Sequence, residues 1–425
     1  MLLVKVRKIV FMPLHSTSPP VQHGIRANLT QILHQLLQVF LVGLTIGMTR
    51  IVVPGLAKTE FGLGEQQFFL LTTFVVTFGA VKAVMNLFAG RFSDRFGRKR
   101  VLVAGWMAAL PIPLLLLYAP NWSWVVAATA LLGVNQGLCW SMTLNSKLDM
   151  THLSQKGLVN GINEFSGYAA VALAGVVTAW LVEVYGARQG LALFGTIVIL
   201  SGLILAILMI KETRPWALAH ASAVSASSMP PPSLGQAFLY ASWQNRNLLA
   251  LNQAGLVEKF TDALVWIILP VWFVAQNLTL VQASSIIGVY ALLWGASQLL
   301  TGPASDRFGR KPLIVGGMWL CGVGVLLLVL THTVWLWTLE AGLIGFGMAM
   351  LYPTLGAAVA DVSPPMQRGT LLGVYRFWRD FGYAVGALCM GLLAQWAQGL
   401  SVTFWLVGVA MLLSGAWVAL AFNKD

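Results

Sequence analysis

The chain alternates between long apolar runs and short polar or charged segments. Six apolar runs of helical length begin near Ile32, Phe68, Val101, Trp124, Leu158 and Gly190, and six more begin near Asn247, Ala283, Pro312, Trp335, Gly369 and Val402. A helix that crosses a bilayer needs about 20 predominantly apolar residues. The pattern therefore predicts an all-α membrane protein with 12 transmembrane helices. An even number of spans places both termini on one side.

A polar segment at residues 211–246 separates the two sets of six runs. Its Ser- and Ala-rich stretch and the three consecutive prolines Pro230, Pro231 and Pro232 are typical of a flexible linker. We therefore predict five parts of the chain. These are a cytoplasmic N-terminal tail at 1–31, a six-helix half at 32–210, a cytoplasmic linker at 211–246, a second six-helix half at 247–422 and a cytoplasmic C-terminus at 423–425.

Residues of the first predicted half recur in the second half at one fixed spacing in the sequence. We call this spacing, which is the distance from Gly90 to Gly302, the repeat offset. The loop that runs from Asp94 to Lys99 recurs from Asp306 to Lys311, and Asp149 recurs as Asp361. The glycines that keep this register are Gly133, Gly157 and Gly161, which map onto Gly345, Gly369 and Gly373. Parallel six-helix repeats are a transporter architecture with the substrate site between the halves, near mid-membrane.

Composition excludes most soluble proteins and most enzymes. Hydrophobic residues make up 58% of the chain and charged residues only 9%, whereas soluble proteins carry about 25% charged residues. A β-barrel is disfavoured because lumen-facing positions keep its strands alternately polar. No catalytic constellation and no ATP-binding P-loop is recognisable. Cys139, Cys321 and Cys389 lie singly in apolar runs, so we expect no metal site and no cofactor.

The basic residues indicate the orientation in the membrane. With the N-terminus inside, 19 of the 26 Lys and Arg residues lie on the cytoplasmic side, two lie outside, and five lie within predicted spans. Short cytoplasmic loops collect Lys and Arg, so this asymmetry predicts an inner-membrane protein with both termini cytoplasmic. The net charge of +12 then reflects topology and attraction to lipid headgroups, and we expect no nucleic-acid partner.

The repeated loop reads GRFSDRFGRK from Gly90 and GPASDRFGRK from Gly302. Both copies resemble the loop signature of the major facilitator superfamily, which runs Gly, three residues, Asp, Arg or Lys, one residue, Gly and two basic residues. The resemblance covers the chain after about residue 30. It implies a secondary transporter, often a monomer, whose two halves rock around a central site that binds a small molecule.

In that family such loops latch the cytoplasmic gate. The resemblance assigns this role here to Gly90, Asp94, Arg95, Gly97, Arg98, Asp149, Gly302, Asp306, Arg307, Gly309, Arg310 and Asp361. We expect Arg98 and Lys99 to reach Asp149, and Arg310 to reach Asp361. The alternative is that these charges only fix topology, because basic residues alone satisfy the positive-inside rule.

Ionisable residues within the spans form the candidate substrate or proton site. Each costs about 2.5 to 3.5 kcal/mol near the bilayer centre, so each should face a cavity or a partner. In the seventh span, Glu258 and Asp262 share a face beside Lys259. Such a pair could hold a cation, or could carry a proton when one carboxylate keeps the other neutral. Internal salt bridging is the equal alternative for this cluster and for the charged residues of the eleventh span.

The eleventh span carries Arg376, Arg379 and Asp380. An arginine pair suits a carboxylate or a phosphate, because each guanidinium grips two oxygens. Glu164 of the fifth span matches Arg376 at the repeat offset, whereas a slip of three residues sets it against Arg379. Both registers remain open.

Five further residues are weaker candidates. Arg50 could contact substrate or extend to the outer interface, and Lys82 could contact substrate or extend to the inner one. Asn135 and Trp140 of the fourth span and Tyr352 of the tenth lie where the family's cavity wall would be. Trp140 and Tyr352 are also related by the repeat offset, so a substrate could stack between them.

Five intramembrane cations favour an organic or inorganic anion as substrate, and we expect Arg379→Ala to abolish its transport. Proton coupling through Asp262, Glu258 or Glu164 is the predicted energy source. One alternative is proton-coupled efflux of hydrophobic cationic drugs, although no arginine precedes Gln136-Gly137 and the fifth span has no proline, unlike the family's drug exporters. Another alternative is a receptor or scaffold that does not transport.

Overall fold

The computed structural model describes residues 21–63, 67–152, 155–224, 233–364 and 367–423. The predicted tail therefore lies largely outside the described residues. Within them the chain is helical and has no strand. Its helices are α1 Leu29–Thr59, α2 Phe68–Phe96, α3 Arg98–Ala109, α4 Ile112–Leu117, α5 Trp122–Met150, α6 Lys156–Tyr185, α7 Ala187–Leu208, α8 Arg214–Val224, α9 Leu234–Leu239, η3 Tyr240–Gln244, α10 Arg246–Ala275, α11 Leu280–Phe308, α12 Arg310–Leu330, α13 Val334–Val362, α14 Arg368–Ala397 and α15 Ser401–Ala421.

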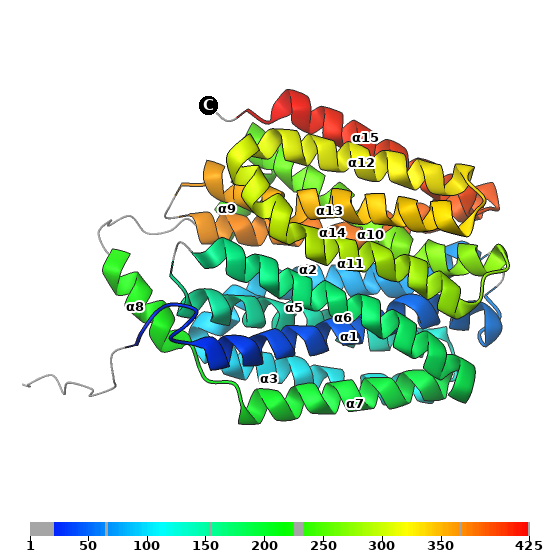
Figure 1. Ribbon diagram of the computed structural model, residues 1–425, viewed down its shortest axis with the longest axis horizontal. Coiled ribbons are helices and arrows are strands. Elements are labelled where there is room, and N and C mark those ends of the chain that lie inside the picture. Colours follow the sequence, from blue (N-terminus) through cyan, green and yellow to red (C-terminus); the bar gives the residue numbers. More distant parts are fainter. Residues whose placement is uncertain (1–20, 64–66, 153–154, 225–232, 365–366, 424–425) are drawn as a thin grey trace, which may run out of the picture.

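The long helices lie side by side along one direction and form a bundle (Figure 1). In the described part of the chain, ten segments are long and apolar enough to cross a membrane, one of them formed by α3 and α4 together. The predicted all-α membrane fold is therefore confirmed. The helices α10 and α14 are not among the ten. Both are 30 residues long and carry the mid-helix charges, so the count of twelve spans stays a prediction.

The repeat offset recurs in the helix bounds. Both ends of α11 lie one repeat offset after the ends of α2, and the same holds for α13 after α5 and for α14 after α6. The backbone of Gly97, between α2 and α3, has φ of 89°, and Gly309, between α11 and α12, has φ of 92°. Glycine adopts this left-handed conformation without a steric penalty, so the two signature loops turn in the same way.

Two groups of helices meet along the middle of the bundle. We call α1–α7 the first helix group and α10–α15 the second helix group. Helix α2 packs along α14, and α6 packs along α11 (Figure 1). Close packing depends on glycine, as expected where small residues let membrane helices approach. A Cβ at Gly79 would lie 2.5 Å from the Cβ of Tyr383, and one at Gly382 would lie 2.1 Å from the carbonyl oxygen of Leu256.

The segment at 211–246 is more ordered than its composition suggested. It contains α8, which projects from the left end of the bundle in Figure 1, together with α9 and η3. Ser233 and Gln236 form a reciprocal capping box at the start of α9, and this arrangement stabilises a helix N-terminus. The Trp378 indole donates to the Ser242 hydroxyl at 2.8 Å. The described parts of the predicted linker are therefore largely helical, while its flexibility and its limits stay a prediction.

We expect Gly382→Ala to destabilise the protein, because its new methyl group would lie within 2.1 Å of the α10 backbone. Overpacking of this kind costs about 1 to 3 kcal/mol. Thermal unfolding of the purified protein in detergent measures the change. Gly373→Ala is the matched control on the same helix, because a Cβ there meets nothing within 4 Å. Equal unfolding temperatures for the two variants would contradict the packing argument.

Candidate functional site

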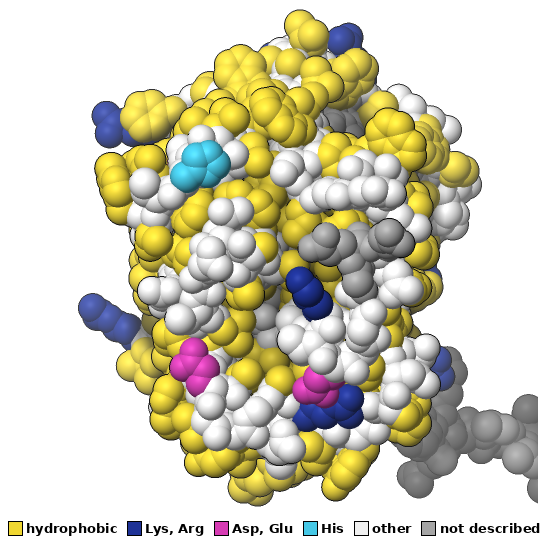
Figure 2. Space-filling view, turned by 90° about the vertical axis from the view of Figure 1, so that its right-hand side faces the viewer, with side chains coloured by type: hydrophobic (Ala, Val, Ile, Leu, Met, Phe, Trp, Pro, Cys, Tyr) yellow, Lys and Arg dark blue, Asp and Glu magenta, His cyan; other side chains and the backbone are white. Residues whose placement is uncertain are grey.

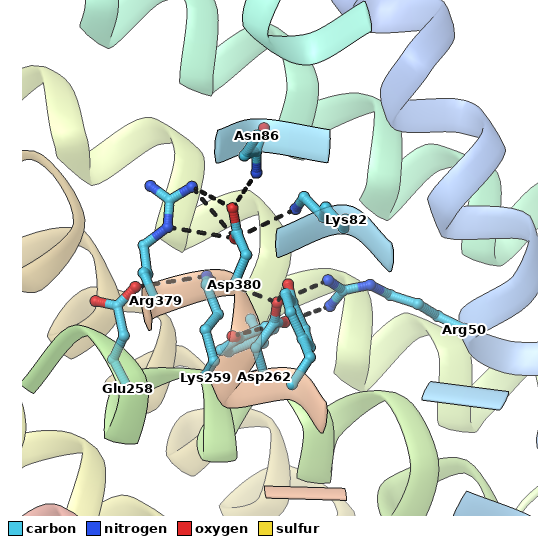
Figure 3. A network of polar contacts seen from close by, with 10 residues as sticks. Arg50, Lys82, Asn86, Glu258, Lys259, Asp262, Arg379 and Asp380 are labelled. Atoms are coloured by element: carbon cyan, nitrogen blue, oxygen red, sulfur yellow. Dashed lines mark hydrogen bonds and ion pairs between the residues drawn. The ribbon is translucent and has the colours of Figure 1, made fainter. Parts of the chain in front are cut away.

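Charged side chains from four helices meet in the middle of the bundle (Figure 3). They come from α1, α2, α10 and α14, so both helix groups contribute. The residues of this network are Arg50, Lys82, Asn86, Glu258, Lys259, Asp262, Arg379 and Asp380 (Figure 3). Charged groups inside a bilayer face either a partner or a water-filled cavity.

The carboxylate of Asp262 has a complete set of donors. Arg50 donates from Nη1 to Oδ1 at 2.5 Å and from Nη2 to Oδ2 at 2.9 Å. Tyr290 donates to Oδ1 at 3.1 Å, and the Tyr383 hydroxyl donates to Oδ2. Both charged side chains are buried, and their positions differ by the repeat offset. The interpretation that Arg50 extends to the outer interface is wrong, because it forms this buried pair instead.

Asp380 joins two cations. Arg379 donates from Nη2 to Oδ2 at 3.0 Å, and the Lys82 ammonium lies 3.6 Å from Oδ1. The amide of Asn86 also donates to Oδ2. Lys82 is therefore held at mid-helix rather than at the inner interface. One carboxylate can contact both cations, because it offers four acceptor positions.

Lys259 lies between two carboxylates and three aromatic rings. Its Nζ is 3.5 Å from Glu258 Oε1 and 3.9 Å from Asp262 Oδ2. The rings of Trp294, Tyr352 and Tyr383 lie 4.5, 4.8 and 5.4 Å from it. Aromatic faces attract cations at such distances. The two Glu258 oxygens accept no hydrogen bond from the described residues, so Lys259 supplies the nearby charge.

A cavity of about 610 Å³ lies between the helix groups. Its polar lining includes Lys82, Asn86, Glu164, Arg376 and Arg379, and its aromatic lining is Trp140, Tyr352 and Tyr375. The cavity extends to Asp306 and Arg310, beside the Gly309 loop. Asp306 is 69% exposed. The cavity therefore reaches the surface at the end of the bundle that carries Gly97 and Gly309, which we call the signature-loop end.

The opposite end of the bundle is closed above the network. The Trp266 ring makes edge-to-face contacts with Phe74 and Phe78 of α2 and with Tyr383 of α14. The Arg50 guanidinium lies 5.3 Å from the Trp266 ring. Figure 2 shows this end of the molecule, whose visible surface carries few charged side chains. These aromatic side chains thus cover the network on the side away from the signature-loop end.

Glu164 and Arg376 line the cavity from opposite helix groups. Oε1 of Glu164 accepts from Trp140 Nε1 at 3.1 Å and from Asn163 Nδ2 at 2.7 Å. Oε2 of Glu164 has no hydrogen-bond partner among the described residues. Arg376 likewise makes no ion pair or hydrogen bond with the part of the chain that the structure describes. The Arg376 guanidinium is therefore available to a ligand, whereas Oε2 of Glu164 is buried without a hydrogen-bond partner among the described residues.

The three predicted wall residues lie in two different places. Trp140 and Tyr352 line the cavity, and the Tyr168 ring packs against both, with centroids 5.7 Å from Trp140 and 6.1 Å from Tyr352. A substrate stacked between Trp140 and Tyr352 stays a prediction. Asn135 is fully buried and donates to the carbonyl oxygen of Gly105 on α3 at 3.0 Å. It does not belong to the cavity, because α5 turns it toward α3.

The signature loops make the expected pairs. Arg98 Nε lies 2.9 Å from Asp149, and Arg310 Nε lies 3.2 Å from Asp361. Arg310 also pairs with Asp306 at 2.6 Å. Lys99 does not bind Asp149 as expected, because its ammonium donates to the carbonyl oxygen of Ile207 at 2.8 Å.

Among the described side chains, Arg95 and Arg307 form no ion pair between helices. Arg95 and Arg307 lie over the adjacent rings of Phe96 and Phe308, at 5.2 and 5.5 Å. A Cβ at Gly90 or Gly302 would meet nothing within 4 Å. The side chain of Asp94 lies outside the described part of the structure. A role of these residues in gating stays a prediction.

Several functional contacts escape prediction from sequence. Tyr168, Tyr290 and Tyr383 are single polar groups in apolar runs, and their hydroxyls are not distinguished by spacing. Tyr168 and Tyr383 do share the motif Gly-Tyr-Ala. Glu212 was missed as well: it accepts from the backbone N–H of Arg98 at 2.9 Å and of Lys99 at 3.2 Å. A carboxylate at a helix N-terminus stabilises α3, but its position in the linker gave no signal.

We expect Arg50→Leu to lower the free energy of unfolding by about 3 to 5 kcal/mol, because it leaves Asp262 buried without its cation. Adding Asp262→Leu removes the second charge, so the double variant should be more stable than Arg50→Leu alone. Thermal unfolding in detergent compares the three proteins. A double variant less stable than Arg50→Leu would show that the pair does not carry this stability.

Comparison with known proteins agrees with this architecture. The family described as Major Facilitator Superfamily matches residues 36–258 and 251–425. An uncharacterized MFS-type transporter of Burkholderia pseudomallei (strain K96243) is 27% identical over 393 residues, which is 89% of this chain and 88% of the relative. A probable 4-methylmuconolactone transporter of Cupriavidus pinatubonensis is 25% identical over 349 residues, 75% of this chain and 76% of the relative. The chain is a member of the major facilitator superfamily of membrane transporters.

Proposed function

We propose that this protein is a secondary active transporter that carries a small organic anion across the inner membrane together with a proton. The observation that carries this proposal is the guanidinium of Arg376. It lines the central cavity and has no carboxylate partner among the described residues. The two other cations of the cavity wall, Lys82 and Arg379, share Asp380. Arg376 is therefore the group that an anionic ligand would complete.

The cavity suits a small molecule with an apolar body. Its volume of about 610 Å³ lies within the range of small-molecule sites, about 300 to 1,000 Å³. Trp140, Tyr352 and Tyr375 present aromatic surface beside Arg376. A planar carboxylate would place its charge on Arg376 and its ring or double bonds against these side chains. The relative named as a probable 4-methylmuconolactone transporter supports a small organic substrate of this kind.

The transport cycle that we propose uses two six-helix halves and twelve spans. The repeated helix bounds support this division, with α10 and α14 as spans that carry the central charges. The signature-loop end would be cytoplasmic, as the basic residues indicate. The cavity is open there, so this arrangement would be the inward-facing state. Separation of Arg50 from Asp262, and closure of the Arg98 and Arg310 loops, would accompany opening to the outside.

We expect Arg376→Ala to weaken saturable anion uptake at least tenfold. Losing a hydrogen-bonded charge pair of about 1.5 to 3 kcal/mol weakens binding about tenfold to more than a hundredfold. Arg376→Lys keeps the positive charge but loses the two parallel N–H donors of the guanidinium, so the loss of uptake should be smaller. Uptake of radiolabelled benzoate and of a muconolactone into proteoliposomes with a more acidic exterior measures this. Arg214→Ala, an exposed position on α8, is the control.

Ethidium and similar cationic drugs form the second arm of this experiment. Glu164 also lines the cavity, and a carboxylate beside aromatic rings could bind a hydrophobic cation. Drug-driven proton movement that depends on Glu164 and is indifferent to Arg376→Ala would replace the proposed function with cation efflux. Anion uptake by the wild type, without any proton movement in response to drugs, would support the proposed anion transport.

A further inference from the structure

We infer that the second helix group binds an anionic phospholipid on its outer surface, with one acyl chain in a groove between α10 and α15 and the phosphate on Arg246 and Lys311. We call this groove the lipid groove. It shares no lining residue with the central cavity. The inference therefore goes beyond the proposed function and does not depend on which solute the protein carries.

The lipid groove has a volume of about 510 Å³ and is lined by side chains of α10 and α15. On α15 its lining residues include Ala410, Leu413, Trp417 and Leu420, which follow one another at intervals of three or four residues. Residues at this spacing lie on one side of a helix. Leu413, Trp417 and Leu420 are exposed, and α15 lies at the edge of the bundle (Figure 1). The groove therefore faces the surrounding lipid.

The wall of the lipid groove is apolar apart from Gln253 and Ser414, and these two side chains bind each other. The Ser414 hydroxyl donates to Gln253 Oε1 at 2.9 Å, and Gln253 Nε2 donates to the carbonyl oxygen of Ala250 at 3.0 Å. A polar group is costly in an apolar environment when it has no hydrogen bond. Because both side chains are already hydrogen-bonded, a hydrocarbon chain can cover them without that cost.

The length of the lipid groove matches one leaflet of a bilayer. From Ala410 to Leu420 the helix rises by about 15 Å, and half of a hydrocarbon core about 30 Å thick is the same distance. Leu420 lies beside the last residue of α15. Trp417 lies about one turn from that end, where tryptophan is typical of a membrane interface. The groove thus runs from headgroup level to mid-membrane, as an acyl chain does.

Two cations meet at the headgroup end of the lipid groove. Arg246, the first residue of α10, donates from Nη2 to the carbonyl oxygen of Leu420 at 3.2 Å. Lys311, at the end of the second signature loop, donates from Nζ to Asn423 Oδ1 at 3.3 Å. Reciprocal hydrogen bonds between Asn247 and Asn423 join the start of α10 to the end of α15. Neither cation makes an ion pair with a described residue.

The helices around these two cations carry no competing carboxylate. The helices α9, η3, α12 and α15 contain no Asp or Glu, and the acidic residues of α10 belong to the central network. Asp306 and Asp361 are paired with Arg310. A phosphate that approaches Arg246 and Lys311 therefore meets positive charge. Lys and Arg at the cytoplasmic surface attract anionic lipids for this reason.

A second copy of this chain is the other occupant that an exposed apolar stripe suggests. In a two-fold dimer each copy presents the same patch to the other. Arg246 and Lys311 would then lie close to the same two cations of the second copy, and like charges repel. An anionic lipid complements the two cations, so the charges favour the lipid.

The test uses the full-length protein labelled with fluorotryptophan, in detergent, and phosphatidylglycerol that carries a nitroxide on its acyl chain. The nitroxide broadens the fluorine resonance of a nearby indole. Trp417 lines the groove, and Trp405 is exposed toward the other end of α15. Replacement of each by Phe assigns its resonance. Each cation near the headgroups contributes about fivefold to affinity, so Trp417 should respond at a concentration at least tenfold lower than with nitroxide-labelled phosphatidylcholine. Trp405 should respond equally to both lipids.

Charge variants test the two cations. Arg246→Gln with Lys311→Gln should remove the preference for phosphatidylglycerol at Trp417. Lys211→Gln with Arg214→Gln is the matched control, because it removes the same charge from exposed positions in the segment after α7, and it should keep the preference. Persistence of the preference without Arg246 and Lys311 would overturn the inference.

Groove variants test the acyl chain. Ala410→Phe fills the groove and keeps both cations, so it should weaken the response of Trp417 to both lipids. Val409→Phe, at the exposed neighbouring position, should leave the response unchanged. Two results with the wild type count against the inference whether or not the variants fold. One is an equal response of Trp417 to the two lipids, and the other is broadening of Trp417 at rising protein concentration without lipid, which would identify a second copy as the occupant.

Discussion

The contact between the two helix groups depends on the buried carboxylate of Asp262. It sits on α10 and accepts from Arg50 on α1, Tyr290 on α11 and Tyr383 on α14. A charge away from water is tolerated when its partners are complete. Because these donors come from both groups, the charge can stay buried only while the groups are in contact at this end. The same requirement explains the aromatic layer around it, which keeps water out.

The remaining charges of the centre divide according to their partners. Lys82 and Arg379 are tied to Asp380, and Lys259 lies between Glu258 and Asp262. These pairs orient the helices and determine the electrostatic potential at the site. Glu164 and Arg376 face the cavity with unused bonding capacity. A transporter needs such incompleteness, because a ligand can stabilise one state over another only through contacts that it alone supplies.

Much of this arrangement could be predicted from the sequence, and the reasons for the rest are physical. Run lengths predicted the long helices, and the offset from Gly90 to Gly302 predicted equal loops and equal helix bounds. Arg98 and Arg310 reached their predicted aspartates because the loops are short. The rotation of each helix was not predictable, because spans that are apolar on all sides give little periodicity. That rotation decides that Asn135 faces α3 and that Arg50 meets Asp262.

The segment that joins the helix groups is bound to the first group at its start and to the second group at its end. Glu212 binds the N-terminus of α3, and Thr213 donates to Asp149, so the start of the segment belongs to the first group. Ser242 binds Trp378, and Asn252 donates to the carbonyl oxygen of Ala241, so its end belongs to the second. The boundary between two separately anchored pieces thus falls between α8 and α9. Each helix group therefore binds the part of the joining segment nearest to it. As a consequence, we expect that the chain can be expressed as two complementary fragments that assemble in the membrane.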